Sequence, residues 1–325
     1  MSTLSFTGDM ARLQQAITES HDLVVRRNTV LEALNLRTGA RLLELGCGGG
    51  YYAYEAARFV GPTGQVCAID ISPDQVAAAQ RRCAEFSWVE CRVADIAAPP
   101  YGEAEFDTVF AVQVLEYLAD LDAGLRQIHR MLRPGGRLVI VATDWSSAVW
   151  HSENAPRMQR VLTAWAPHTP CRDLPAILAA RLRRTGMQPL RQTAIPILNT
   201  SYNPACFSYW VAQVIRQFVV SRQSVTDQEG TEWLEEFAKL EQSGAYFFCL
   251  NPVLTEAMQP PISPDRSSST RQSSSVRRRT APEPQDYRKE HQRFRSEQRY
   301  RLPWASLASP NAPSLLSRRK GSTRT

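Results

Sequence analysis

The sequence of 325 residues predicts an α/β fold, built on a doubly wound and mostly parallel sheet. Short apolar stretches of strand length alternate with helical stretches from residue 41 to residue 144. A glycine-rich turn, "LGCGGG", directly follows the first of these strands. Alternation of this kind is typical of parallel strands joined by helices that cover both faces of the sheet.

The elements up to residue 144 follow one another regularly. A broken helical pattern over 10–34 comes first, with Leu13, Ile17, Leu23 and Val30 among its apolar positions. The expected strands are 41–45, 65–70, 88–95, 106–115 and 137–144, and the expected helices between them are 51–59, 72–86 and 120–132. Ser72 and Pro73 suit the start of their helix, since serine is a favoured N-cap and proline a favoured first residue.

After residue 144 the pattern changes. Helical stretches at 154–165 and 173–185 precede a strand over 186–198, and a helical insertion is expected over about 199–243. An aromatic-rich alternating stretch at 244–254 predicts the last strand, antiparallel to the others. The expectation is therefore a Rossmann-like sheet of about seven strands within a domain spanning 1–258.

The residues from 259 to 325 differ in composition from the rest. They hold 15 Lys and Arg and 5 Asp and Glu, which leaves 38−15 = 23 basic and 32−5 = 27 acidic residues for the domain. The formal net charge is thus near −4 for the domain and near +10 for the tail. Ser, Pro and Arg dominate the tail without an apolar period, so we expect it to be disordered. It is either a solvated extension or an arm for nucleic acid or membrane surfaces.

Seven cysteines, an odd number without a C-x-x-C pair, favour a reducing compartment. No apolar leader or membrane-spanning run is visible, so a cytoplasmic location is expected. We predict no metal site, and the oligomeric state stays open.

The ligand expected at the glycine turn is nucleotide-like. Glycines between a strand and a helix let the backbone approach a ligand closely. Asp70 and Asp95 end the second and third strands, where a parallel sheet binds its ligands. The letters "GGGYYA" also suit a nicotinamide dinucleotide, but Glu44 ahead of the loop would repel its pyrophosphate. An acid there suits S-adenosylmethionine, which carries a sulfonium and an ammonium and no phosphate.

Five motifs in order, "LLELGCGGG", "GPTGQVCAIDISPDQV", "VADI", "FDTVFAVQVLEYLAD" and "MLRPGGRLVIVATDW", resemble those of the class I S-adenosylmethionine-dependent methyltransferases. The likeness is greatest to the group of ubiquinone/menaquinone-biosynthesis and other small-molecule methyltransferases. It is strong over residues 20–145 and looser to 254. Tyr117 replaces a histidine that is common in that group.

The resemblance implies a set of cofactor-binding residues. Glu44 and the loop with Gly46, Gly48 and Gly50 would hold the methionine end. The others implied are Asp70 for the ribose hydroxyls, Ile71 and Ile96 beside the adenine, Asp95 at its amino group, and Val112 and Gln113 along the methionine carboxylate or sulfonium.

The catalytic base, if the acceptor requires one, is expected after the fifth strand or within 199–243. His151 is the first candidate, and His168, Tyr202 and Tyr209 follow. Trp145, Trp150, Trp210 and Phe207 would form an apolar wall or belong to the core.

The leading functional interpretation is methyl transfer to a small-molecule acceptor. The alternatives are a methyltransferase for RNA or protein that uses the basic tail, a non-catalytic interaction module with this fold, and thiol chemistry of the arsenic type. The chain reads "AVQV" where methyltransferases for amino groups of bases or glutamine carry an "NPPY"-type tetrad, and this favours the small-molecule interpretation.

Overall fold

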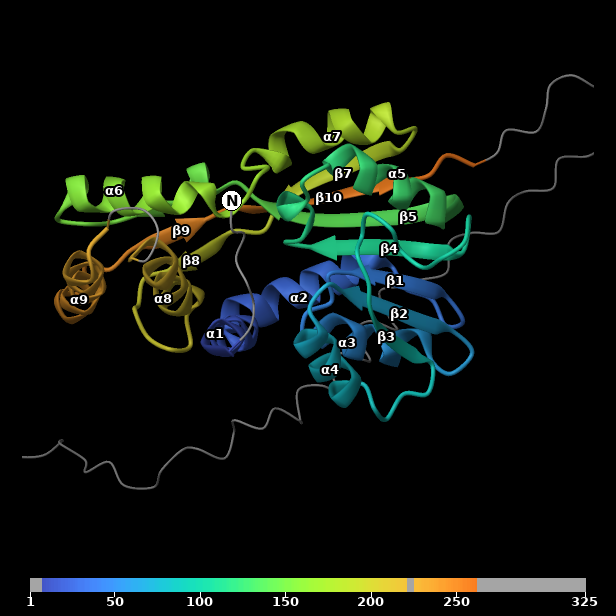
Figure 1. Ribbon diagram of the computed structural model, residues 1–325, viewed down its shortest axis with the longest axis horizontal. Coiled ribbons are helices and arrows are strands. Elements are labelled where there is room, and N and C mark those ends of the chain that lie inside the picture. Colours follow the sequence, from blue (N-terminus) through green and yellow to red (C-terminus); the bar gives the residue numbers. More distant parts are fainter. Residues whose placement is uncertain (1–7, 221–224, 262–325) are drawn as a thin grey trace, which may run out of the picture. The chain divides into compact units, whose positions relative to one another are not determined.

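The computed structural model describes residues 8–220 and 225–261, and its centre is a seven-stranded sheet (Figure 1). The strand order is β3-β2-β1-β4-β5-β10-β7. The strands are β1 (Arg41–Leu45), β2 (Gln65–Asp70), β3 (Val89–Val93), β4 (Phe106–Val112), β5 (Leu132–Thr143), β7 (Gln188–Ala194) and β10 (Pro252–Met258).

Strand directions confirm the predicted sheet, mostly parallel with one antiparallel strand. β1 runs parallel to both β2 and β4. In this register Leu43 of β1 pairs with Cys67 of β2 on one side and with Val109 of β4 on the other. β10 lies antiparallel between β5 and β7. The chain builds outward from β1 to β3 and then returns to β4 beside β1, which places the switch point of the sheet between β1 and β4.

Helices cover both faces of this sheet because its strands are apolar on both sides. Helices α2 (His21–Leu34), α3 (Tyr51–Val60) and α4 (Pro73–Arg82) pack on the face that includes Leu42 and Phe110. Helices α5 (Leu121–Met131) and α7 (Leu174–Arg184) pack on the opposite face, which includes Leu43 and Val109. Figure 1 shows α5 and α7 beside the upper strands and α3 and α4 beside the lower ones. The two separate core clusters on opposite faces of the sheet confirm the predicted double winding.

A second, smaller sheet extends beyond the end of the first. Its strands are β6 (Val149–Trp150), β9 (Phe248–Leu250) and β8 (Ile197–Asn199), in that order and all antiparallel. It shares one core with helices α1 (Gly8–Glu19), α6 (Ala155–Trp165), α8 (Phe207–Val220) and α9 (Asp227–Ser243). Trp150 stacks on Phe237 in this core, with ring centroids 4.8 Å apart. We call this part of the chain the helical lobe.

Two expected strands are divided between the sheets, so those predictions were wrong in extent. The strand expected over 186–198 is β7 followed by β8, with Ile195 and Pro196 between them. The last strand, expected over 244–254, is β9 followed by β10, which continues to Met258. An alternating pattern does not reveal where a chain leaves one sheet for another, because both sheets bury alternate residues.

Three short 3₁₀ helices occur in the described part of the chain. They are η1 (Leu115–Tyr117) after β4, η2 (Trp145–Ser147) after β5 and η3 (Ala166–His168) after α6. None of the helices between residues 8 and 261 that the structure describes combines the length and the apolar character that a membrane crossing requires. The expected tail lies outside the described residues from 262 onward, so its disorder and the domain boundary at 258 stay predictions.

Candidate active site

The glycine loop turns between β1 and α3 with three glycines in left-handed backbone conformations. Gly46, Gly48 and Gly50 have φ angles of 70°, 50° and 76°. A Cβ on Gly46 would lie 2.3 Å from Val114 Cγ2, and one on Gly50 would lie 2.8 Å from the Ala79 backbone. The loop therefore needs glycine at Gly46 and Gly50 for two reasons, the φ angle and the space.

Asp70 joins the glycine loop to the turn after β2. Its Oδ2 accepts a hydrogen bond from the Gly48 amide (2.8 Å), and its Oδ1 accepts one from the Ser72 amide (2.9 Å). The next residue, Ile71, is 72% exposed although it is a large apolar side chain. A carboxylate beside an exposed apolar side chain suits a ribose with an adjoining adenine.

Glu44 lies buried beneath the loop, and its Oε2 has no hydrogen-bond partner among the described residues. Burial raises the pKa of the Glu44 carboxyl well above its ordinary value, and nearby Cys91 and Asp70 raise it further. A cation placed beside a buried carboxylate favours its charged form. The sulfonium or ammonium of S-adenosylmethionine would satisfy this requirement.

The predicted residues after β4 are held in place by an arginine that the sequence analysis missed. Arg26, a buried residue of α2, donates through Nη1 to Gln113 Oε1. Gln113 in turn donates to Thr143 Oγ1 (3.1 Å) and has a φ angle of 54°. Its neighbour Val112 ends β4 at the same edge of the sheet.

Arg26 was recognisable in the sequence as a cation on an apolar stripe. The other buried residues of α2 are Leu23, Val30 and Leu34, at helical spacing around it. Its Nε has no partner among the described residues. A buried guanidinium with a free N–H suits a carboxylate, so Arg26 and Gln113 together fit the methionine carboxylate of the cofactor.

Two of the expected adenine contacts have local partners in the structure. Asp95 is exposed, and its Oδ1 accepts a hydrogen bond from the Ala97 amide (2.8 Å). Ile96 is buried in the core under α5. The roles of these two residues toward the cofactor stay predictions.

Helix α1 contacts the glycine loop from outside the sheet. Gln75 at the start of α4 donates to Gln14 (2.8 Å), and Tyr51 at the start of α3 donates to Glu19. Arg82 lies with Cζ 3.5 Å from the centre of the Tyr51 ring. The N-terminal helix therefore borders the glycine loop and the starts of α3 and α4.

The two candidate histidines lie in different environments. His151 is exposed, and its backbone amide donates to Phe247 O (3.0 Å). His168 is buried, in a ring cluster with Trp145, Trp165 and Tyr117. Of the other expected wall residues, Trp150 and Phe207 are buried in the core of the helical lobe, while Trp210 donates to Pro204 O (2.7 Å).

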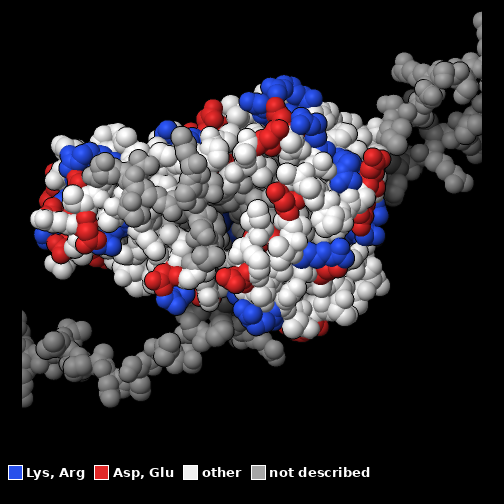
Figure 2. Space-filling view, viewed as in Figure 1, with Lys and Arg blue, Asp and Glu red and all other residues white. Residues whose placement is uncertain are grey.

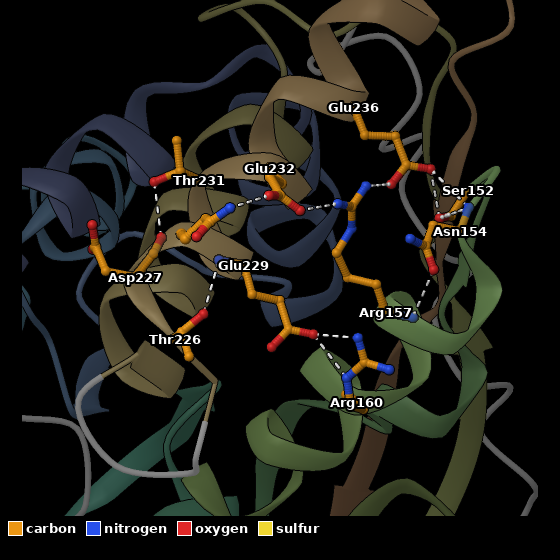
Figure 3. A network of polar contacts seen from close by, with 11 residues as sticks. Ser152, Asn154, Arg157, Arg160, Thr226, Asp227, Glu229, Thr231, Glu232 and Glu236 are labelled. Atoms are coloured by element: carbon orange, nitrogen blue, oxygen red, sulfur yellow. Dashed lines mark hydrogen bonds and ion pairs between the residues drawn. The ribbon is translucent and has the colours of Figure 1, made fainter.

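A polar network fixes the segment after His151 to the helical lobe (Figure 3). Glu236 of α9 accepts hydrogen bonds from Ser152 Oγ (2.6 Å) and from Arg157 of α6 (2.7 Å). Arg157 also contacts Glu232 at 3.1 Å. Burial raises the pKa of Glu236, but the hydrogen bonds from Ser152 and Arg157 outweigh it and lower the pKa below its ordinary value.

The fold is that of the doubly wound class, and the edge of the sheet carries a glycine loop, an acid bound to its backbone and a buried acid beneath it. A family model described as "Methyltransferase domain" matches residues 43–140, which include the glycine loop, Asp70 and Gln113. The chain belongs to the class I S-adenosylmethionine-dependent methyltransferases, and S-adenosylmethionine is its methyl donor.

The chain is similar to individual proteins over different shares of its length. The chain is 35% identical over 170 residues to a ubiquinone biosynthesis O-methyltransferase of Xanthomonas euvesicatoria, which covers 50% of this chain and 69% of the relative. It is 38% identical over 121 residues to an uncharacterized 37.1 kDa protein in a transposon of Streptomyces fradiae, covering 37% of this chain and only 35% of that protein. The YcgJ protein of Bacillus subtilis shares the fold, with a TM-score of 0.51 and 16% identity over 73% of this chain and 99% of its own.

Proposed function

We propose that this protein transfers the methyl group of S-adenosylmethionine to a small-molecule acceptor. The observation that carries the proposal is the set of buried Glu44, buried Arg26 and half-buried Gln113 next to the glycine loop, together with 35% identity to a methyltransferase that acts in ubiquinone biosynthesis. The bound cofactor supplies an activated methyl group, and the protein supplies binding and alignment.

Each residue of the site would bind a different part of the cofactor. Asp70 would bind the ribose hydroxyls, Glu44 would face the positive charge, and Arg26 with Gln113 would hold the carboxylate. Holding donor and acceptor in line can supply about 7–11 kcal/mol of the barrier without any acid or base. A base is needed only where the acceptor must lose a proton.

We place the acceptor on the side of the helical lobe. The lobe joins the sheet just after β5 and carries the aromatic residues Tyr202, Tyr209 and Trp210, whose neighbouring rings are 4.9–5.0 Å apart. Acceptor specificity in folds of this kind resides in segments added to the common sheet. The predicted catalytic role of His151 belongs to this proposal, since its segment leads from β5 into the lobe.

A macromolecular acceptor is the second candidate, and the charges of the described domain give it little support. Basic and acidic side chains are interspersed on the face that Figure 2 shows. The basic group over α7 includes Arg181 and Arg184, which both pair with Asp122. A continuous basic surface is the usual requirement for nucleic acid, and this face does not present one. The tail, outside the described residues, has the richest basic composition. A cytoplasmic location stays part of this proposal.

The test is to incubate the protein with S-adenosylmethionine labelled in the methyl group and with separated cell fractions. We expect label in a small molecule other than S-adenosylmethionine, and none above background in RNA or protein. Asp70→Ala serves as the control for specific transfer. Label found in RNA or protein alone would replace the first candidate with the second, and no label in any fraction would contradict both.

A further inference from the structure

The loop that follows α6 brings His168 to the same edge of the sheet as the cofactor site. The Cys171 amide donates to the carbonyl of Glu116 in η1 (3.1 Å), which ties this loop to the end of β4. The His168 ring lies 6.4 Å from the Tyr117 ring of η1 and 5.6 Å from Trp145 of η2, which follows β5. His168 therefore sits beyond the carboxyl ends of β4 and β5, on the side where the methyl group would be transferred.

The ring of His168 is held rigidly by aromatic neighbours. It stacks on Trp165 with centroids 3.7 Å apart and an interplanar angle of 12°. Trp145 meets it edge to face, at 85°. His168 is only 1% exposed, whereas Trp145 and Tyr117 are half-buried, so the cluster reaches the surface through these two rings.

One hydrogen bond fixes the tautomer of His168. Its Nδ1 lies 2.8 Å from the carbonyl oxygen of Trp165. A carbonyl oxygen can only accept, so Nδ1 carries the hydrogen, and Nε2 presents a lone pair. Burial lowers the pKa of His168 to about 4, with a smaller contribution in the same direction from Arg172. The ring is therefore neutral at pH 7.

The lone pair of Nε2 is buried and has no partner among the described residues. Glu116, on the neighbouring element, likewise leaves Oε2 buried and without a partner among them. Buried polar atoms of native proteins are nearly always hydrogen-bonded, so a buried atom without a partner requires one, such as a ligand, an ion or a water. Two such atoms at one edge of the sheet point to a group that arrives from outside the chain.

We propose that His168 is a catalytic residue whose Nε2 accepts the proton of the acceptor's hydroxyl group, with Trp145 and Tyr117 flanking a flat acceptor. This rests on the proposed function. The hydroxyl proton passes to Nε2 while an oxygen lone pair forms the bond to the methyl carbon. The bond from that carbon to sulfur breaks, and its electron pair stays on sulfur. His151, exposed and outside this ring cluster, is the rival base.

Two substitutions separate the roles of the two ring nitrogens. His168→Asn places an amide near Nδ1, where it can still donate to Trp165, but removes the acceptor at Nε2. His168→Gln places its amide near Nε2 and so can restore a hydrogen-bond acceptor there. Both should melt within a few degrees of the parent. His129→Ala, at a histidine of α5, is the matched control, and His151→Ala tests the rival base.

A binding readout that needs no turnover comes from ¹⁵N spectroscopy of the full chain saturated with S-adenosylhomocysteine. The probes are 2-naphthol, which can donate a hydrogen bond, and 2-methoxynaphthalene, which has the same ring and cannot. We expect 2-naphthol alone to shift the Nε2 resonance of His168 upfield. No shift with 2-naphthol, or an equal shift with both probes, would overturn the proposal.

The kinetic readout is methyl transfer into the small-molecule fraction. We expect His168→Asn to lower kcat about a hundredfold or more with little change in KM, because general bases contribute about 10²–10⁴ in rate. His168→Gln should recover part of the loss, and His129→Ala, at a histidine of α5 that has no role in the site, should not change kcat. A loss of kcat in His151→Ala without one in His168→Asn would favour the rival base and overturn the proposal. If methyl transfer occurs and the kcat of His168→Asn equals that of the parent, this inference fails and the proposed function stands. If no small molecule is methylated, the proposed function fails. In that case the spectroscopic result still decides whether Nε2 of His168 accepts a hydrogen bond from a hydroxyl group.

Discussion

Single residues of the glycine loop determine whether the chain can turn tightly enough to meet a cofactor. Gly46 and Gly135 both have left-handed backbones, with φ angles of 70° and 79°. A Cβ at Gly46 would meet Val114, whereas one at Gly135 would meet nothing within 4 Å. Comparing alanine substitutions at these two glycines therefore separates the effect of the φ angle from that of the close contact with Val114.

Gly46→Ala should lower the free energy of unfolding more than Gly135→Ala does. The control, Gly135→Ala, should lower the free energy of unfolding by about 1–2 kcal/mol, because its backbone keeps a left-handed conformation that alanine disfavours. Gly46→Ala should lose about 1–3 kcal/mol beyond that, since overpacking displaces Val114. Urea unfolding measures both, and equal losses would show that the close contact with Val114 is not important.

A buried carboxyl at Glu116 should make stability depend on pH. Burial raises its pKa to about 7 from an ordinary value of 4.5. Between these values the unfolded chain releases the proton before the folded chain does, so Glu116 destabilises the fold increasingly as pH rises from 4.5 to 7. Glu116→Gln removes this cost, and its stability relative to the parent should rise by on the order of 2 kcal/mol between pH 5 and pH 8.

Urea unfolding at the two pH values tests this, with the exposed Glu103→Gln as the matched control. The control should show the same difference from the parent at both pH values. If Glu116→Gln also shows a constant difference, the carboxyl of Glu116 is not a buried group that ionises near neutral pH.

At the residue scale, local sequence patterns single out acids more readily than bases. Glu44 and Asp70 follow from their places at strand ends, which local patterns reveal. His168 was only a secondary candidate, because its environment depends on Trp145, Trp165 and Tyr117, which come together from three separate segments. No spacing rule within one segment reveals such a cluster.

At the scale of elements, the helical lobe depends on the contact between α6 and α9. Glu236 is 6% exposed and is the hydrogen-bond acceptor of Ser152, Arg157 and the Glu153 amide. Removing one partner of a buried ion pair leaves the other charge without compensation. The segment after His151 would lose its anchor at the same time.

Glu236→Ala should therefore lower the free energy of unfolding by about 3–5 kcal/mol, the cost of an unpaired buried charge. Glu235→Ala changes an exposed neighbour on the same helix and should stay within about 0.5 kcal/mol of the parent. Chemical denaturation of the two variants provides the comparison. A loss at Glu236 no larger than that at Glu235 would contradict the structural role of the network.

The elements of the large sheet were predictable because each has its own local signal. β1 is a short strand with three leucines before the glycine turn, and α4 begins with the cap and proline that such helices favour. The small sheet was not predicted, since β6 has two residues and pairs with β9 almost 100 residues later. Strands this short have no periodicity to detect, and only the packing of Trp150 and Phe248 in the lobe core creates them.

At the scale of the whole molecule, the described domain contains every residue assigned to the cofactor. The backbone of Gln259 still pairs with Gly135 and Gly136 at 2.8 and 2.9 Å. A shortened chain should therefore end at Pro261 and not at the predicted boundary after Met258.

Truncation after Pro261 should preserve melting temperature, cofactor affinity and methyl transfer to small molecules. The physical reason is that the removed residues are rich in Ser, Pro and Arg and lack the apolar content to form part of a core. The full chain assayed in parallel is the control. Loss of small-molecule turnover would place the tail in the active site, and loss of transfer to RNA alone would favour the macromolecular acceptor.

The central claim, that the site at the ends of β1 and β2 binds S-adenosylmethionine, is tested most directly by calorimetry. The parent should bind S-adenosylmethionine and not NAD. Asp70→Ala should weaken that binding about a hundredfold or more, because two hydrogen bonds to a charged group are worth about 1.5–3 kcal/mol each. Asp74→Ala, an exposed acid four residues later, should leave it unchanged. Binding of NAD, or undiminished affinity for S-adenosylmethionine in Asp70→Ala, would contradict the account.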